Sequence, residues 1–138
     1  MAETLLLIGT LTYKEKKMAI SIILPRAQGW TVVKVPPTHE KLTVDGEQCL
    51  GAAYFKTKTI YIDNELTPEA LLDVMRHEIS HAIIAETKFD GTDLFEEEDI
   101  CNFAGMYGQI VCDLADEAIR KLEEEEDEEY EDDSEDDE

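Results

Sequence analysis

The fold of this chain is decided by residues 67–86, TPEALLDVMRHEISHAIIAE. Thr67 can cap the first turn of a helix with its hydroxyl group, and Pro68 suits the first helical position, where its missing N–H is not needed. Apolar residues then recur every three or four positions, which predicts a helix to about Glu86 with one buried face. That face consists of Leu71, Leu72, Met75, Ile79, Ala82 and Ile83.

The residues before this helix are typical of short strands joined by turns, because β-branched and apolar residues cluster in short runs between glycine, proline and lysine. The expected strands are Thr4–Leu11, Met18–Leu24, Thr31–Val35, Leu50–Phe55 and Thr59–Ile62, with a basic turn at Lys14–Lys17. The last two strands pair as a hairpin across Lys56–Lys58. Ile60 and Ile62 then lie on one face of the sheet and Tyr61 on the other. One long helix over Thr4–Leu24 is the alternative for the first segment.

A second helix is expected to begin near Glu96 and to end near Leu122. Its apolar stripe consists of Ile100, Phe103, Ala104, Tyr107, Ile110, Val111, Leu114, Ala118 and Leu122. From Glu123 to Glu138, 14 of 16 residues are acidic. Like charges repel and no apolar stripe remains there, so we expect residues 123–138 to form a disordered tail. Residues 1–122 are predicted to form one α+β domain, in which a small twisted, mostly antiparallel sheet packs on the two helices.

Net charge narrows the possible partners. The 138 residues include 34 acidic and 12 basic side chains, for a formal net charge of −22. This balance disfavours direct binding to nucleic acid or to an anionic membrane surface, since both need cationic contacts. No apolar run approaches the roughly 20 residues of a membrane span. Three cysteines are too few for a disulfide scaffold, and an odd number cannot all pair within one chain. We therefore expect a soluble cytoplasmic protein with reduced thiols.

The motif with the clearest chemistry lies inside the first helix and reads His77-Glu78-Ile79-Ser80-His81. Residues four apart on a helix differ by about 40° around its axis and about 6 Å along it, so both imidazoles can reach one metal ion. Glu78 is turned about 100° from His77, which puts its carboxylate beside the metal, where it can accept a proton from water. The pattern indicates a metal site with a general base. Two ordinary helix histidines, or a structural metal without turnover, are the alternatives.

A catalytic zinc ion usually takes three protein ligands and keeps one position for water. The acidic cluster Glu96–Asp99 opens the second helix, and Glu98 follows His81 by about 17 residues. A glutamate there completes a His-His-Glu set if the second helix folds back antiparallel. Glu98 is the expected third ligand, because small or polar residues on its helix face would allow a close approach to the metal. Those residues are Cys101, Asn102 and Gly105. Glu97 is the alternative ligand.

The pattern His77-Glu78-x-x-His81 followed by Glu98-x-x-x-Asn102 resembles that of the gluzincin metallopeptidases. Its short spacing is similar to that of the minimal, ImmA/IrrE-type members common in phages and bacterial mobile elements, over about residues 50–115. The resemblance implies a zincin-like fold, a Zn²⁺ ion, hydrolysis of a peptide bond, and a protein or peptide substrate lying along an edge strand, here Leu50–Tyr54. Asn102 stands where the family usually has aspartate, and it is expected to accept a hydrogen bond from a ligand histidine.

In the expected mechanism, zinc is held by His77, His81 and Glu98, and Glu78 acts as general base on water and then protonates the leaving amine. Larger members of the family use a further histidine or tyrosine to stabilise the oxyanion. Tyr107, Tyr54 and His39 are candidates for that role by their chemistry alone. A different function class remains open, a non-catalytic protein whose metal is structural and whose acidic tail binds a basic partner.

Three further residues have a simpler structural interpretation. Trp30 follows Gly29 and is interpreted as an anchor in the core or at the sheet edge rather than as a platform for substrate. Cys101 and Cys112 lie three turns apart on one helix face, and we expect them to be small core residues rather than ligands or nucleophiles.

Overall fold

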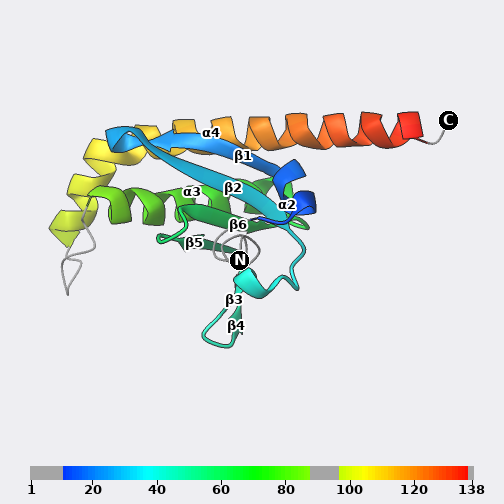
Figure 1. Cartoon of the computed structure of the whole chain (residues 1–138). Helices are drawn as coiled ribbons and strands as arrows, with labels where there is room; N and C mark the ends of the chain where they lie inside the picture. Colours follow the sequence, from blue (N-terminus) through cyan, green and yellow to red (C-terminus); the bar gives the residue numbers. More distant parts are fainter. Residues whose placement is uncertain (1–10, 88–96, 137–138) are drawn as a thin grey trace, which may run out of the picture.

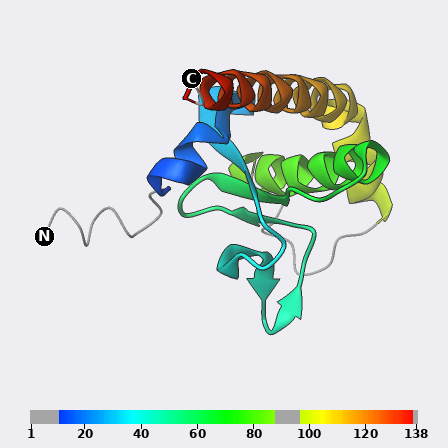
Figure 2. The ribbon, with the colours of Figure 1, turned by 90° about the vertical axis from the view of Figure 1, so that its right-hand side faces the viewer.

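In the computed structural model, which describes residues 11–87 and 97–136, a four-stranded sheet lies against two long helices (Figures 1 and 2). The strands are β1 (Ala19–Leu24), β2 (Gln28–Val35), β5 (Gly51–Tyr54) and β6 (Thr59–Asp63). The helices are α3 (Pro68–Thr87), which contacts β5 and β6, and α4 (Glu97–Asp136), which contacts β1 and β2. The α+β class predicted from the sequence is confirmed.

The sheet is mixed, with strands in the order β1-β2-β6-β5. β1 and β2 pair antiparallel, as do β5 and β6, but β2 and β6 run parallel. The parallel pair arises because the chain leaves β2 and passes through η2 (Glu40–Leu42) and a small hairpin before it returns along β5 and β6. That hairpin consists of β3 (Thr43–Val44) and β4 (Glu47–Gln48). The predicted hairpin of Leu50–Phe55 with Thr59–Ile62 is confirmed. The sheet is mostly antiparallel, as expected, apart from its central pairing.

Side chains on the two faces of the sheet enter two separate cores. Ile60 and Ile62 face the long helices and Tyr61 faces away from them, as the two-residue period of a strand predicts. The larger core, between the sheet and the two helices, includes Ile22, Trp30, Val32, Met75, Ile79, Ile83, Ala118 and Leu122. The smaller core consists of Val33, Val35, Leu42, Ala52 and Tyr61. The sheet is therefore apolar on both faces, and the long helices cover only one of them.

Helix α3 forms as the sequence predicts. The Thr67 hydroxyl accepts a hydrogen bond from the backbone N–H of Ala70 at 3.2 Å, and Pro68 is the first helical residue. The apolar stripe faces the sheet, with Leu72 half-buried and the other five members buried. The helix ends at Thr87, one residue beyond the predicted end.

The segment before β1 differs from its prediction. Residues Lys14–Lys17 belong to a short helix, α2 (Tyr13–Lys17), rather than to a basic turn. The cause is a capping box, in which the Thr12 hydroxyl accepts from the Glu15 N–H and the Glu15 carboxylate accepts from the Thr12 N–H, both at 3.1 Å. The strand predicted at Met18–Leu24 is confirmed as β1, which rules out one long helix over Thr4–Leu24. The strand predicted at Thr4–Leu11 lies outside the described residues except for Leu11.

Strand β2 begins at Gln28 instead of the predicted Thr31. The break expected at Gln28-Gly29 lies instead at η1 (Pro25–Ala27), directly before β2. Arg26 and Ala27 adopt positive φ values of 68° and 57° there, which turns the chain sharply enough for Leu24 to pair with Gln28. Nothing in residues Pro25–Ala27 marks a left-handed turn, since glycine or asparagine is the usual signal.

Helix α4 departs furthest from its prediction. Its buried residues are Val111, Leu114, Ala115, Ala118 and Leu122, all in the middle of the helix. Ile100 and Ile110, which belong to the predicted stripe, are 54% and 37% exposed. Figures 1 and 2 show that the first turns of α4 are bent away from the rest of the helix and extend past the end of the sheet.

The structure continues α4 through residues 123–136 to Asp136, where the sequence predicts a disordered tail. Glutamate is a good helix former. In addition, Lys34 on β2 forms an ion pair with Glu126, in which Nζ and Oε1 are 2.7 Å apart. Among the residues of α4 whose burial is described, which end at Asp127, Leu122 is the last buried one, in agreement with the predicted end of the apolar stripe. The division of the chain into a domain over 1–122 and an acidic segment over 123–138 stays a prediction.

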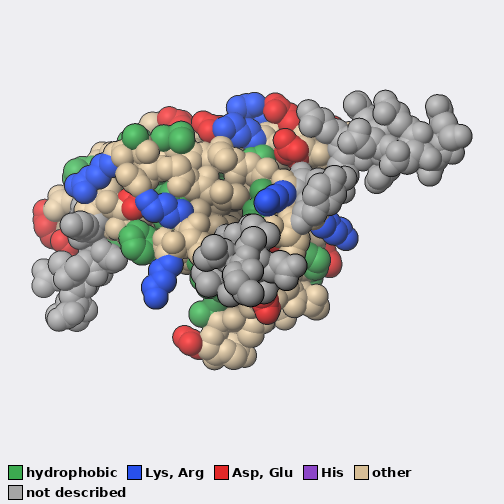
Figure 3. Space-filling view, viewed as in Figure 1, with side chains coloured by type: hydrophobic (Ala, Val, Ile, Leu, Met, Phe, Trp, Pro, Cys, Tyr) green, Lys and Arg blue, Asp and Glu red, His purple; other side chains and the backbone are tan. Residues whose placement is uncertain are grey.

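The surface shows no strong segregation of charge on the face drawn in Figure 3, where acidic and basic side chains of the described residues are interspersed. Within the described residues, no helix combines the length and the apolar character that crossing a bilayer requires.

Candidate metal centre

His77, Glu78 and His81 lie on the side of α3 that looks toward the edge strand β5. A cavity of about 470 Å³ opens between these two elements. It is lined by Trp30, Val44, Cys49, Gly51, Ala52, Ala53, Phe55, His77, Glu78, His81, Ile84 and Ala85. A second cavity of about 370 Å³ adjoins it on the side of Leu50, Asp73 and Val74, and shares Cys49, Gly51, His77 and Glu78 with it. Together the two cavities form a groove along β5, which we call the α3–β5 groove.

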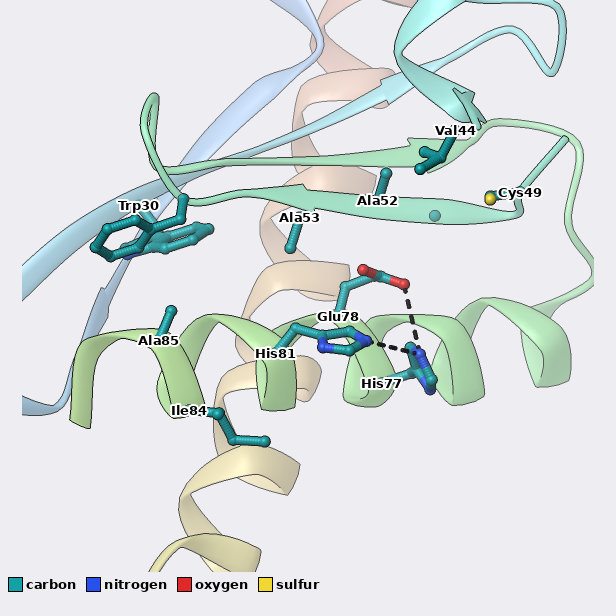
Figure 4. A pocket seen from close by; sticks show the side chains of 12 residues that line it. Trp30, Val44, Cys49, Ala52, Ala53, His77, Glu78, His81, Ile84 and Ala85 are labelled. Carbon is teal, nitrogen blue, oxygen red and sulfur yellow. Dashed lines mark hydrogen bonds and ion pairs between the residues drawn. The ribbon is translucent and has the colours of Figure 1, made fainter. Parts of the chain in front are cut away.

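The two imidazoles converge in this groove (Figure 4). The Nε2 atoms of His77 and His81 are 3.1 Å apart, and their ring centroids are 4.7 Å apart in an edge-to-face arrangement. Two nitrogens that bind one zinc ion in tetrahedral geometry lie about 3.3 Å apart, since each Zn–N distance is about 2.0–2.1 Å. The spacing of the histidine pair therefore fits bidentate chelation of a zinc ion without rearrangement of the helix.

Glu78 lies between the helix and the edge strand with its carboxylate turned toward the histidines (Figure 4). It is only 6% exposed, and its Oε2 is 4.0 Å from the Nε2 of His77. This separation is too long for a hydrogen bond and leaves room for a water molecule to contact both groups. The carboxylate stands next to the point where the imidazoles converge, as the 100° turn between neighbouring helix residues predicts.

Burial changes the protonation behaviour of these groups. Desolvation raises the pKa of Glu78 above its ordinary value, and the nearby His77 offsets part of that rise. Desolvation also lowers the pKa of His81, and repulsion from His77 lowers it further. A lowered pKa keeps His81 neutral at neutral pH, which is the form that binds metals. A raised pKa brings Glu78 closer to the range in which a carboxylate can both accept and return a proton.

Gly51 allows the edge strand to lie close to the helix. A Cβ atom at this position would be 2.7 Å from Cγ1 of Val74 and 2.9 Å from Cγ of Glu78. Any larger residue would therefore push β5 away from α3 or displace the Glu78 side chain. Gly51 sets the width of the groove at the point where the predicted general base lies.

The free edge of β5 faces the groove. β5 pairs only with β6 in the described sheet, with Ala52 opposite Tyr61. The Asp63 N–H donates to the Leu50 carbonyl, so the alternation of an antiparallel ladder directs the backbone groups of Ala52 toward β6. The N–H and C=O groups of Gly51 and Ala53 then point away from β6. Within the described residues, the predicted edge strand Leu50–Tyr54 lies at the edge of the sheet and begins one residue later.

The predicted third ligand, Glu98, does not join the histidine pair in this structure. Among the described residues, no three His, Cys, Asp or Glu side chains are grouped so that they could hold a metal ion. Glu97 and Glu98 are both exposed, and neither lines the groove. Glu98, with Glu97 as its alternative, therefore stays a prediction.

The face of α4 that carries Glu98 is turned to solvent in this structure. We expected the face through Cys101, Asn102 and Gly105 to approach the metal closely, but all three residues are exposed. A Cβ atom added to Gly105 would meet nothing within 4 Å. The first turns of α4 pack through Phe103 and Tyr107 instead, whose apolar rings lie against the larger core. Hydrophobic burial thus decides which face of α4 turns inward.

None of the three candidates for an oxyanion stabiliser lines the groove. Tyr107 contacts Phe103, with ring centroids 5.6 Å apart. The Tyr54 hydroxyl donates to the Lys41 carbonyl at 2.6 Å on the opposite side of the sheet. His39 also lies on that side, where its Nε2 is 2.6 Å from the Glu15 carboxylate and its ring stacks on Tyr61. Of the described residues that line the groove, none beyond the motif is a tyrosine or a histidine.

Several groove residues were not predicted as functional from the sequence. Trp30 is an anchor in the core, as expected, at 2% exposure, but it also forms one end of the groove. Phe55 and Ile84 line the same end. Ile84 could have been found, because it follows His81 by three residues on the same helix. Trp30 precedes the motif by 47 residues and carries no comparable signal.

Cys101 is exposed and Cys112 is half-buried, so the expectation that both are core residues is wrong for Cys101. All three cysteines, including Cys49 in the groove, are free thiols.

The structure thus brings together His77, His81 and Glu78 on one wall of a groove whose other wall is an edge strand, and leaves Glu98 apart from them. Comparison of the chain with known protein families, with curated proteins and with solved structures finds no match.

Proposed function

We propose that this chain is a zinc-dependent metallopeptidase of the gluzincin type. One observation carries the proposal: two imidazole nitrogens 3.1 Å apart lie beside a buried carboxylate, in a groove bordered by an unpaired strand edge. A pair of structural histidines needs neither a groove nor a desolvated carboxylate beside it. The proposal makes the protein an enzyme, with Glu78 as its catalytic residue and His77, His81 and Glu98 as the metal ligands.

The donor set suits zinc, which prefers imidazole nitrogen and carboxylate oxygen and takes three protein ligands in catalytic sites. When bound, zinc would lower the pKa of a water molecule to about 7 and polarise the carbonyl group of a substrate. His77 and His81 supply two ligands from one helix. The third ligand must come from outside α3, and Glu98 fills that role if the first turns of α4 approach the pair when the metal binds.

Glu78 is the proton-transfer group in this proposal. Its carboxylate accepts a proton from water as the oxygen attacks the scissile carbonyl carbon, and then donates that proton to the nitrogen of the leaving amine. Its burial supports this role, because a desolvated carboxylate holds a proton more readily than one in water. Gly51 keeps the edge strand close enough to exclude solvent from one side of the carboxylate.

The edge strand supplies the means of holding a peptide. An extended peptide beside β5 can pair with the backbone groups of Gly51 and Ala53, which adds a strand to the sheet. Such pairing would lay the peptide backbone along the groove and across the position of the two imidazoles. Because main-chain pairing does not depend on the side chains of the peptide, any preference for particular peptide side chains has to come from the ends of the groove.

The decisive experiment compares wild type with the Glu78→Gln variant. We expect one zinc ion per chain in both proteins, measured by elemental analysis after dialysis, and cleavage of a peptide library by wild type alone. His77→Ala provides the control, since it should lose both zinc and cleavage. Equal cleavage by wild type and Glu78→Gln would overturn the proposal.

A non-catalytic protein is the second candidate, in which the metal is structural and the acidic end of the chain binds a basic partner. The observation that favours it is that, within the described residues, only two of the three expected ligands are brought together, while α4 continues beyond the core. One bound zinc without Glu78-dependent cleavage of any library member would select this candidate.

A further inference from the structure

The end of the α3–β5 groove beyond His81 is chemically different from its centre. Four apolar side chains from three separate segments line it: Trp30 from β2, Phe55 from the turn after β5, and Ile84 and Ala85 from the next turn of α3. Figure 4 shows the Trp30 indole lying at this end of the cavity, opposite Ala85. We call this part of the groove the Trp30 end.

The Trp30 indole is fixed in position. Its Nε1 donates to Oε2 of Glu86 at 2.8 Å, and the same oxygen is 3.0 Å from Nζ of Lys58. Lys58 also donates to the side-chain oxygen of Gln28. The only polar atom of the indole is therefore satisfied away from the groove, and the surface that Trp30 offers to a ligand is hydrocarbon.

The charges of the described residues next to the Trp30 end are already paired. Lys58 and Glu86 form an ion pair with each other, and the Glu86 side chain is only 8% exposed. A charged ligand side chain entering here would lose its water shell and find these two charges committed to each other. An apolar side chain would instead displace water from hydrocarbon on several sides.

The distance along the groove limits which ligand residue can reach the Trp30 end. Ile84 and Ala85 follow His81 by three and four residues, which is about 5–6 Å along the helix. An extended peptide advances about 6.6 Å for every two residues, so the side chain that enters the Trp30 end belongs to a residue within about two positions of the scissile bond.

We propose that the Trp30 end is a subsite for a large apolar side chain of a peptide substrate, such as Phe, Leu, Ile or Met. In this subsite Trp30 is the fixed wall, and Ile84 and Phe55 determine specificity. The proposal rests on the proposed peptidase function and adds to it the class of substrate: peptides with a bulky apolar residue at one fixed position near the cleaved bond.

The first test is cleavage of a library of capped decapeptides by the zinc-loaded full-length chain. At one position within two residues of the cleaved bond, we expect Phe, Leu, Ile and Met to be preferred over Lys, Asp and Gly by at least about tenfold in kcat/KM. Ile84→Glu should weaken this preference and favour Lys or Arg at the same position. Ile23→Glu is the matched control, because Ile23 is 62% exposed on β1 and does not line the groove.

Phe55→Glu is the second variant, because Phe55 is 52% exposed and its replacement should not disturb folding. Thermal melting of each variant identifies any that fails to fold. Glu78-dependent cleavage without preference at any position, or with a preference that both folded groove variants leave unchanged, would overturn the subsite and leave the peptidase function intact.

The second test does not depend on cleavage, because Trp30 is the only tryptophan in the chain. The zinc-loaded Glu78→Gln variant is titrated with two capped pentapeptides of alanine, one with Phe and one with Lys at its centre, and tryptophan emission is followed. We expect a saturable change with the Phe peptide and at least about tenfold weaker binding of the Lys peptide.

Binding of the Phe peptide together with no cleavage of any library member would keep the subsite and overturn the peptidase function. Equal responses to the two pentapeptides, or no response to either, would overturn the subsite.

Discussion

Helices α3 and α4 carry comparable apolar stripes in the sequence, yet the structure buries them very differently. α3 lies under the sheet along its length, and its stripe is buried or half-buried from Leu71 to Ile83. The buried side chains described on α4 lie between Val111 and Leu122, and the first part of its stripe remains exposed at Ile100 and Ile110. An apolar stripe thus predicts which face of a helix is buried. The length of helix that the sheet covers determines how many residues of that face are buried.

The largest expected effect comes from truncating matched isoleucines on the two helices. Ile79→Ala on α3 removes a side chain with no exposure and should lower the free energy of unfolding by about 2–5 kcal/mol. Ile100→Ala on α4 should change it by less than about 0.5 kcal/mol, because Ile100 is 54% exposed. Urea unfolding followed by circular dichroism measures both. Equal losses would mean that the first turns of α4 are covered in solution.

Zinc binding should couple the two helices if Glu98 is the third ligand. Zinc at about 100 times its dissociation constant should raise the free energy of unfolding of wild type by about 2.7 kcal/mol. His77→Ala should abolish this gain. Glu98→Ala should reduce it, and Glu97→Ala should not. Thermal melting with zinc and with a chelator gives the comparison, and an unchanged gain in Glu98→Ala would remove α4 from the metal site.

Glycine-to-alanine substitutions separate a close helix contact from an open one. Gly51→Ala should cost about 1–3 kcal/mol, because the new Cβ would lie 2.7 Å from Val74 and 2.9 Å from Glu78. Gly105→Ala on α4 should stabilise the protein by up to about 1 kcal/mol, because its surroundings are open and alanine favours helix. Chemical unfolding of both variants tests the contrast, and a stabilising Gly51→Ala would mean that β5 lies further from α3 than described.

The smallest expected effect concerns acid stability at the C-terminal end of α3. Burial alone would raise the pKa of Glu86, but its hydrogen bonds with Trp30 and Lys58 outweigh that effect and hold the pKa below the ordinary value of 4.5. Ionised Glu86 therefore stabilises the fold above about pH 4.5, and this contribution is lost as the pH falls through the lowered pKa.

Glu86→Gln should therefore be less stable than wild type by up to about 1 kcal/mol at pH 7, and the difference should shrink below pH 4.5. Glu124→Gln is the α4 control, because Glu124 pairs with Arg120 where both side chains are 60% exposed. Melting temperatures between pH 3 and pH 7 measure the difference. A gap between wild type and Glu86→Gln that widens toward acid pH would contradict the assigned pKa direction.

The features that the sequence predicts correctly are local ones. Thr67 caps the helix that follows it, and His77 and His81 are brought together by the helix that contains them both. The capping box of Thr12 and Glu15 is equally local, and its three-residue spacing could have predicted α2 from the sequence.

The features that were missed depend on contacts between distant segments. The indole of Trp30 donates a hydrogen bond to Glu86, which is 56 residues away. In the first turns of α4, Phe103 and Tyr107 pack against the core, and Glu98 is turned away from it. The parallel pairing of β2 with β6 likewise joins strands that the sequence separates by η2, a small hairpin and β5. The periodicity of residues within one helix or strand carries no information about which distant segments contact each other.

The last part of α4 has a consequence for how the protein interacts with ions. Beyond the Lys34–Glu126 pair, the helix continues from Asp127 to Asp136, and 8 of these 10 residues are acidic. Ten helical residues span about 15 Å, so the axis carries about one negative charge per 1.9 Å. Double-stranded DNA carries one per roughly 1.7 Å. A rod of this charge density gathers cations from solution, and a basic partner that displaces them would bind with a steep dependence on salt.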